Sequence, residues 1–284
     1  MNRDGLFKRV SVNAIALWLV LFVLAPSVLV LASSLLTRGD AQLVRAPLTF
    51  ENYRRIVDPL YLDIFLSSFY LAALSTLICL VVGYPFAYLL ARTSPRYRRN
   101  LLLMVVIPFW TSSLVRTYAM IIILKTKGLL NSLLLWAGVI HEPLTILYTD
   151  AAVFVGLVYS LLPFMVLPIY ASVEKLDSRL MEAARDLGAS RAATFVRVVI
   201  PLTMPGIIAG SMLVFLPALG MFYIPDLLGG AKTLLIGNLI KNQFLSARDW
   251  PFGSAASVVL TLVMAVMLLV YYKSVRATRR QEPA

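Results

Sequence analysis

The residues of this chain whose types could bind another molecule are carboxylates and hydroxyls that lie beside aromatic side chains. Asp226 follows Phe222 and Tyr223, and a carboxylate next to aromatic faces is suited to an organic cation, since ring faces attract ammonium groups. Three further candidates lie near a proline within an apolar run: Trp110, Thr111 and Tyr159. These residues are candidates for contact with a bound molecule.

Each candidate also has a structural explanation. A carboxylate such as Asp226 can simply end a helix at a membrane surface, and a tryptophan such as Trp110 is often a packing or interface residue in a membrane helix. Tyr159 has the same alternative. Arg116, which lies in an apolar run, could face a partner subunit, pair with an acidic residue there, or repel small ions.

Residues for catalysis or metal binding do not assemble in this sequence. One cysteine, Cys79, and one histidine, His141, cannot form the usual structural zinc sites. The phosphate loop G-x4-G-K-[ST], the zinc motif H-E-x-x-H and the nucleophile motif G-x-S-x-G do not occur. We therefore predict no catalytic residue, no metal site and no cofactor in this chain, which leaves a membrane enzyme as the weakest hypothesis.

The elements that must position the candidates are membrane helices. Hydrophobic residues make up 60% of the 284 residues, charged residues 14%, and mean hydropathy is +0.83. Apolar runs of this kind reach the roughly 20 residues that cross a bilayer. We predict an all-α polytopic membrane protein, one transmembrane domain over 1–284, with six spans at about 14–36, 64–91, 101–124, 151–171, 205–225 and 252–272.

The charges indicate how the spans are oriented. The net charge is +12, and the segments 1–13, 92–100, 172–204 and 273–284 hold sixteen of the basic residues, against nine in the alternate segments. Because basic residues concentrate on the cytoplasmic side, both termini are predicted to be cytoplasmic. The basic charge is thus explained by orientation and by anionic lipid, and we expect no nucleic-acid partner.

The predicted cytoplasmic segment 174–201 has a helical pattern in two parts. Ser178 can cap a first helix with an apolar stripe, and Gly188 suits the left-handed residue that ends it. Ser190 can begin a second helix, which we expect to stop before Pro201. The apolar stripe consists of Leu180, Ala183, Ala184 and Leu187.

This segment resembles the EAA loop of ABC-importer permeases, whose pattern is E-A-A-x3-G followed by I-x-L-P. Here Val198 and Ile200 stand at the Ile and Leu positions before Pro201. The resemblance implies a type I ABC-importer permease fold and a loop that docks into the cytoplasmic ATPase. The coupling residues that it implies are Glu182, Ala183, Ala184, Asp186, Leu187 and Gly188.

Four other segments are similar to permease subunits of bacterial spermidine/putrescine importers: 108–118, 201–210, 231–238 and 248–253. This resemblance implies polyamine transport across the bacterial inner membrane. It also implies a second homologous permease, two ATPase subunits that carry ATP and Mg²⁺, and a periplasmic polyamine-binding protein. The substrate pathway is then expected to include Asp226, Tyr223, Trp110, Thr111 and Tyr159.

Two alternatives stay open at this point. The chain could be an importer permease for another solute, such as sulfate, ferric ion or thiamine, although an oxyanion pathway should offer basic residues and helix N-termini at mid-membrane. It could also be a stand-alone channel or secondary transporter. That alternative leaves the glycine-jointed segment from Glu182 to Pro201 without a purpose.

Overall fold

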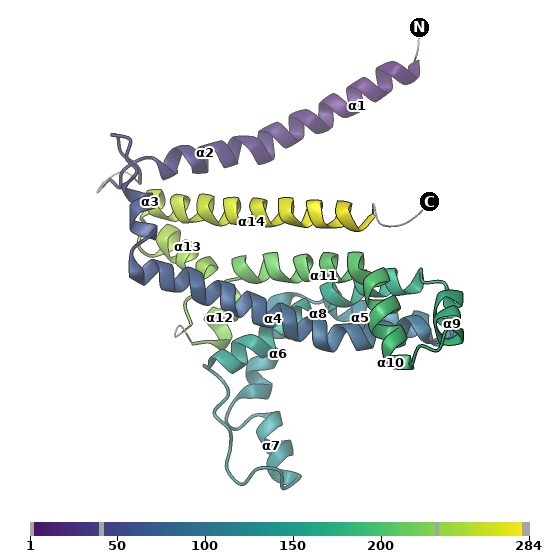
Figure 1. Cartoon of the computed structure of the whole chain (residues 1–284). Helices are drawn as coiled ribbons and strands as arrows, with labels where there is room; N and C mark the ends of the chain where they lie inside the picture. Colours follow the sequence, from purple (N-terminus) through teal and green to yellow (C-terminus); the bar gives the residue numbers. More distant parts are fainter. Residues whose placement is uncertain (1–2, 40–42, 231–232, 280–284) are drawn as a thin grey trace. The chain divides into compact units, whose positions relative to one another are not determined.

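The computed structural model describes residues 3–39, 43–230 and 233–279, which fold into α-helices joined by turns (Figure 1). Within these ranges we find no β-strand beyond an isolated bridge between Thr37 and Arg45. Six helices are long and apolar enough to cross a membrane, which confirms the predicted all-α class. They are Ser11–Ser34, Pro59–Arg92, Ser113–Trp136, Asp150–Glu174, Arg191–Gly220 and Trp250–Lys273.

Contacts between residues group the chain into two compact units, one of 1–63 with 239–263 and one of 64–238 with 264–284. Among the described residues, the first unit contains four complete helical elements and parts of three others. Its elements are α1 (Arg3–Leu19), the π turn η1 (Val20–Leu24), α2 (Ala25–Ser34), α3 (Glu51–Ile56), the start of α4 (Pro59–Arg92), most of α13 (Ile236–Leu245) and the start of α14 (Trp250–Arg279).

Two polar clusters fix the turns of the first unit. The Asn52 amide donates to the carbonyl oxygens of Ser34 and Leu36 at 3.0 and 2.8 Å, which satisfies the end of α2. Arg55 pairs with the buried Asp249 at 2.9 Å and lies over the Phe252 ring at 4.2 Å. Asp249 therefore joins α3 to the first turn of α14.

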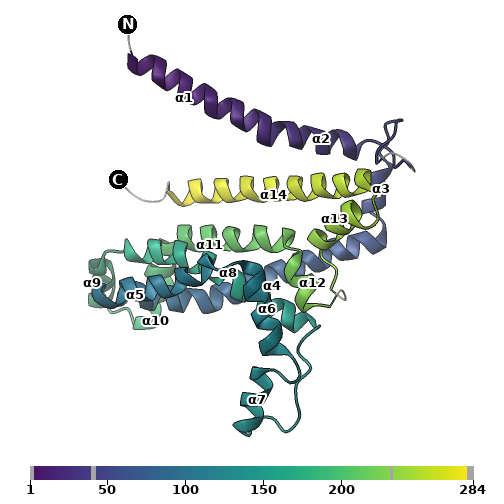
Figure 2. The same cartoon turned by 180° about the vertical axis from the view of Figure 1, so that it is seen from behind.

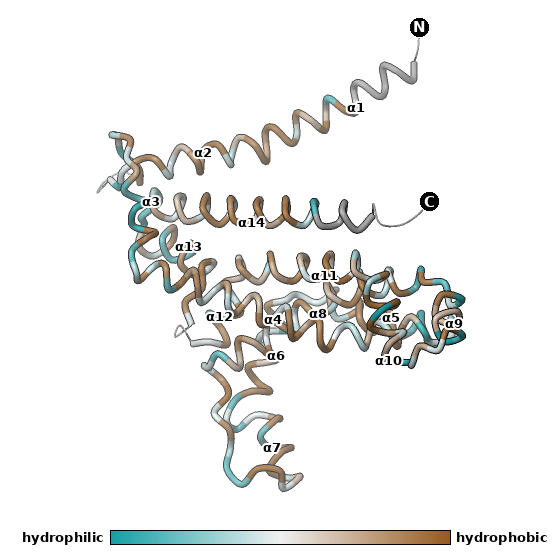
Figure 3. The backbone as a smooth tube through the Cα atoms, in the orientation of Figure 1, coloured by the Kyte–Doolittle hydropathy of each residue, from teal (hydrophilic) through white to brown (hydrophobic). Residues whose placement is uncertain are grey.

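The second unit contains the remaining helices. Its elements are α4 from Ile64, α5 (Pro95–Val106), the 3₁₀ turn η2 (Ile107–Trp110), α6 (Ser113–Leu124), α7 (Leu129–Trp136), α8 (Asp150–Glu174), α9 (Ser178–Asp186), α10 (Arg191–Thr194), the π turn η3 (Phe195–Val199), α11 (Ile200–Gly220) and α12 (Tyr223–Leu228). Helices α4, α8 and α11 run side by side, with α9 and α10 at one end (Figures 1 and 2). Hydrophobic residues cover α8 and α11, and hydrophilic ones gather at α9 (Figure 3).

Helix α8 is the core of the second unit. Its buried side chains recur every fourth residue, and this spacing places them on one face of the helix: Val153, Leu157, Leu161, Met165 and Ile169. Helix α11 approaches that face through Gly206 and Gly210. A Cβ atom on Gly206 would lie 2.7 Å from the Pro168 carbonyl oxygen, and one on Gly210 would lie 2.9 Å from the Met165 sulfur. The two glycines therefore permit the close contact of α8 and α11.

Two predicted spans differ from the helices observed. The run 101–124 is divided between α5 and α6, because the 3₁₀ turn at Pro108 ends in extended backbone at Thr111. The run 205–225 ends early, since α11 stops at Gly220 and Met221 is extended. Phe222 to Asp226 consequently lie beyond a break in the fifth span and not at its end.

The helix after Ser190 was predicted to stop at Pro201, and this prediction is wrong. The chain is helical from Arg191 to Gly220, because the π turn η3 precedes the proline and the Ile200 N–H bonds to the Phe195 carbonyl oxygen. Pro201 then occupies the first turn of α11, where a missing N–H donor is tolerated. About 45 Å of helix results at 1.5 Å per residue.

We expect Gly206→Ala to destabilise the protein by about 1–3 kcal/mol, because the added methyl group collides with backbone and not only with a movable side chain. Thermal unfolding of the purified protein in detergent measures the effect. The matched control is Gly220→Ala, whose Cβ would lie 3.8 Å from the Met264 methyl group and should shift the melting temperature little. Equal melting temperatures for both variants would contradict close contact at Gly206.

Candidate functional site

The helical run from Arg191 to Gly220 is called the long helix below. The segment 177–199, which we call the elbow, consists of α9 and the start of this long helix. The Asp177 carboxylate accepts a hydrogen bond from the Arg179 N–H at 3.0 Å, so Asp177 caps α9 and Ser178, the predicted cap, is its first residue. A carboxylate also suits the positive end of the helix dipole. Ser190 caps the second helix as predicted, its hydroxyl accepting from the Ala193 N–H at 3.2 Å.

The joint of the elbow is a Schellman turn around Gly188. The Gly188 N–H bonds to the Arg185 carbonyl oxygen at 2.8 Å, and the Ala189 N–H bonds to that of Ala184 at 3.0 Å. Gly188 has φ = +86°, a left-handed conformation that costs other residues energy. The predicted glycine joint is therefore present, and the chain direction changes there within three residues.

The elbow exposes much of its apolar stripe. Leu187 is 89% exposed and Leu180 48% exposed, whereas Met181, outside the predicted stripe, is buried. Glu182 and Asp186 are also exposed and have no ion-pair partner within the described ranges. The elbow therefore presents an exposed leucine and two carboxylates on its outer surface.

The buried side of the elbow rests on one face of α4, where Tyr84, Tyr88 and Arg92 lie four residues apart. The Phe195 ring meets Tyr84 and Tyr88 edge-on, with both centroid distances at 5.6 Å. Arg92 stacks over Tyr88 and contacts the Met181 sulfur. These contacts hold α9 and η3 against the same helix.

A polar link fixes the neighbouring end of the bundle. Arg98 of α5 pairs with Glu174 at the end of α8. Hydrogen bonds to Tyr170 and to Glu174 raise the pKa of Arg98, so the guanidinium keeps its charge. Helices α5 and α8 are thus tied together beside the elbow.

The other end of the long helix meets the candidate residues Asp226 and Tyr223. After the break at Met221, α12 carries both, and the Asn238 amide donates to the Asp226 carboxylate and, at 2.8 Å, to the Phe222 carbonyl oxygen. A hollow of about 440 Å³ opens beside the break. Its lining comes from the end of α11, the break and α14: Leu216, Pro217, Gly220, Met221, Phe222, Tyr223 and Met264.

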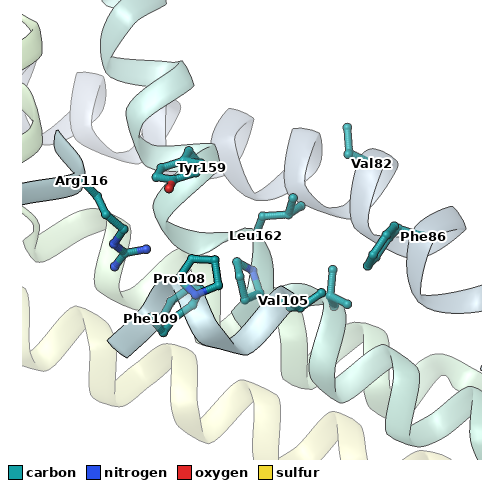
Figure 4. Close-up of a pocket in the computed structure, with 10 residues that line it drawn as sticks. Val82, Phe86, Val105, Pro108, Phe109, Arg116, Tyr159 and Leu162 are labelled. Atoms are coloured by element: carbon teal, nitrogen blue, oxygen red, sulfur yellow. The ribbon is translucent and has the colours of Figure 1, made fainter. Parts of the chain in front are cut away.

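The remaining candidates lie elsewhere in the second unit. Tyr159 lines a second, apolar cavity of about 220 Å³ together with Phe109 and Arg116 (Figure 4). Trp110 is 81% exposed, and the Thr111 hydroxyl is bonded to the Pro108 carbonyl oxygen at 2.7 Å. The structure therefore places Tyr223 and Asp226 on the same short helix, where Tyr223 lines the first hollow, and it brings Tyr159 to Arg116. Asp226, Trp110 and Thr111 do not line either cavity.

Two residues of these sites were not singled out from the sequence. Phe109 precedes the predicted Trp110, and its place after Pro108 was the available signal. Asn238, which holds the Asp226 carboxylate, is separated from it by twelve positions and gives no local signal. Within the described ranges, no group of three or more His, Cys, Asp or Glu residues could hold a metal ion.

Comparison with protein families identifies the class of protein that has this fold. The chain belongs to the family of binding-protein-dependent transport system inner membrane components, whose sequence model matches residues 83–280. With six apolar helices, it is a multi-pass protein of the inner membrane. The family consists of transport components, which agrees with the expectation that the chain is not an enzyme and gives no support to a stand-alone channel.

Comparison with individual proteins shows which transport systems have permeases similar to this chain. The chain is 54% identical over 281 residues to the spermidine/putrescine transport system permease protein PotB of Salmonella typhimurium, covering 99% of this chain and 98% of the relative. It is 56% identical over 264 residues to PotB of Escherichia coli K12, covering 93% and 96%. A bacterial alginate ABC transporter bound to its periplasmic protein has the same fold, with a TM-score of 0.78, 19% identity, and coverage of 97% and 96%.

We expect Phe195→Ala to loosen the elbow, because it removes the ring that contacts both Tyr84 and Tyr88. Aromatic core truncations cost about 3–5 kcal/mol, and the loss should appear as faster amide exchange at 178–199 with little change in α8. Hydrogen–deuterium exchange measures it. Val196→Ala, a truncation of a 59% exposed neighbour, is the control; equal exchange in both variants would show that Phe195 does not anchor the elbow.

Proposed function

We propose that this chain is a permease subunit of an ATP-driven importer that carries polyamines such as spermidine and putrescine into the bacterial cytoplasm. The observation that carries the proposal is the identity of 54–56% to PotB permeases over nearly the whole chain. The carboxylate and aromatic rings at the α11–α12 break support a cationic substrate, since an ammonium group is stabilised by both.

The partners follow from this proposal. The chain pairs with a second homologous permease, and two ATPase subunits bind ATP and Mg²⁺ on the cytoplasmic side. A periplasmic polyamine-binding protein delivers the substrate; the related alginate transporter, which is bound to a periplasmic protein, supports this arrangement. The distribution of basic residues supports an elbow on the cytoplasmic side.

The elbow is the part of this chain that receives force from the ATPase. Leu187, Glu182 and Asp186 offer an apolar contact and two charges to a docking groove. The glycine turn at Gly188 connects this surface to an unbroken helix that ends at Gly220, beside Tyr223 and Asp226. Closure of the ATPase pair then displaces the elbow, and the long helix carries the displacement to the break.

In this mechanism the break between α11 and α12 lies on the substrate pathway. Asp226 supplies negative charge, and Tyr223 supplies a ring face next to the hollow at Met221. Asn238 fixes the carboxylate so that its charge is already oriented when an ammonium group arrives. Trp110 and Thr111 keep a proposed place on the pathway at the break between η2 and α6, where both are exposed for contact with the second permease.

Leu187→Asp should separate the ATPase subunits from the permease. Leu187 is 89% exposed, so the substitution removes few contacts within this chain but places a charge in the docking surface. A central apolar contact of this kind typically costs 2 kcal/mol or more, or about thirtyfold in affinity. Co-purification of the ATPase with the tagged permease measures the loss. Leu245→Asp, the same substitution at a 70% exposed leucine outside segment 177–199, is the control, and full ATPase recovery with Leu187→Asp would refute the docking role.

Asp226→Asn should reduce polyamine uptake about tenfold while the complex still assembles. The amide oxygen of asparagine can replace the acceptor for Asn238, so the local fold is kept and only the charge is lost. Uptake of radiolabelled spermidine by whole cells measures the effect. Glu142→Gln neutralises an exposed carboxylate elsewhere and should transport normally; wild-type uptake by Asp226→Asn would remove Asp226 from the pathway.

A further inference from the structure

Arg116 is a cation within one of the six apolar helices, where an arginine usually pairs with an acid or lines a water-filled path. The described residues place no carboxylate within ion-pair distance of it, and the ion pairs among them are Arg55–Asp249 and Arg98–Glu174. Its Nε atom is buried and has no hydrogen-bond acceptor. Within the described part of the chain, the charge of Arg116 is therefore stabilised by something other than an anion.

Two aromatic rings hold the guanidinium instead. Its central carbon lies 4.7 Å from the centroid of Phe109 and 5.8 Å from that of Tyr159 (Figure 4). The rings come from η2 and α8, so the site, which we call the aromatic cage, is built by two elements that do not carry the arginine. Because ring faces attract cations without regard to their chemical identity, the cage suits an ammonium group as well as a guanidinium.

The cage opens into the apolar cavity of about 220 Å³. Apart from Arg116 and the two rings, the wall is aliphatic and aromatic, with two prolines: Val82, Phe86, Val105, Pro108, Leu162, Pro163 and Val166. Such a wall cannot solvate a second charge, but it can accept methylene groups. A cation site at the edge of an apolar cavity matches a molecule that carries an ammonium group at the end of a hydrocarbon chain.

One of the two elements that supply the rings lies at a helix break, and the other is a continuous helix that contains a proline. Phe109 belongs to the 3₁₀ turn that separates α5 from α6, and Tyr159 precedes Pro163 within α8. Helix α6, which carries Arg116, contacts α12, the helix of Asp226. A movement of α12 can thus be transmitted to Arg116 through direct helix contact.

We propose that the aromatic cage is a second polyamine subsite, which binds one terminal ammonium group while the adjoining methylene chain enters the apolar cavity. Arg116 occupies the cage when substrate is absent, and the two cations exclude each other because like charges repel at this distance. The inference rests on the polyamine function proposed above and adds a residue that substrate must displace. An inorganic cation, which has no hydrocarbon chain to bury, gains too little to replace the arginine.

The test uses the whole permease–ATPase complex in lipid nanodiscs without the binding protein, and measures binding of radiolabelled spermidine by equilibrium dialysis. Arg116→Met removes the competing cation while keeping a long apolar side chain, and should tighten spermidine binding about tenfold. Arg116→Lys keeps a competing cation and should bind spermidine like wild type. Adding Phe109→Leu to Arg116→Met should abolish the gain, whereas adding Tyr159→Phe, which keeps the ring, should not.

Three results would overturn the proposal. One is unchanged spermidine affinity in Arg116→Met. Another is failure of Arg116→Met, but not of Arg116→Lys, to assemble with the second permease, since Arg116 would then pair with an anion of that subunit. If Arg116→Met does not fold, the rate of spermidine uptake by variants of Phe109 provides the test. Phe109→Leu should slow uptake, because it removes the ring, and Phe109→Tyr should not. Equal uptake rates for these two variants are the third result, and they would reject the aromatic cage as a polyamine subsite. A wild-type complex that transports no polyamine rejects the proposed function itself, which separates the two failures.

Discussion

The close contact between α8 and α11 is the constraint on which the second unit depends. Gly206 and Gly210 bring α11 against the buried ridge of α8, and no larger residue fits between Gly206 and the Pro168 carbonyl oxygen. This contact fixes the long helix at its middle, so its two ends have defined neighbours: the tyrosines of α4 at the elbow, and α12 at the break. The positions of the elbow and of the α11–α12 break are consequences of where that helix starts and ends.

Local patterns in the sequence were sufficient for the elements that depend on neighbouring residues. The glycine turn at Gly188, the cap at Ser190 and four of the six apolar spans follow from short-range rules, and the structure has each of these. The helix across Pro201 was missed because a π turn is a shift in hydrogen-bond register that leaves no clear mark in composition. Asp177, which caps α9, was not predicted as a cap because the adjacent Ser178 satisfies the same preference for a short polar residue at the start of a helix.

The candidate sites were less predictable because they depend on contacts between distant segments. The carboxylate of Asp226 was visible in the sequence, but the Asn238 amide that orients it comes from another helix. Arg116 had several possible partners, and only the fold shows Phe109 and Tyr159 on either side of its guanidinium. Trp110 stood out by residue type, yet its less conspicuous neighbour Phe109 lines the cavity.

The prolines of the long helix have a mechanical consequence. Pro201 and Pro205 are four residues apart and lie on one side, and neither supplies the N–H that an α-helix uses on that side. Two backbone donors are therefore missing close to the elbow, which makes bending easier there and favours bending toward one side. In the mechanism proposed above, a push on the elbow is divided between sliding of the helix along its axis and bending at this turn, and the α8 contact at Gly206 is the pivot.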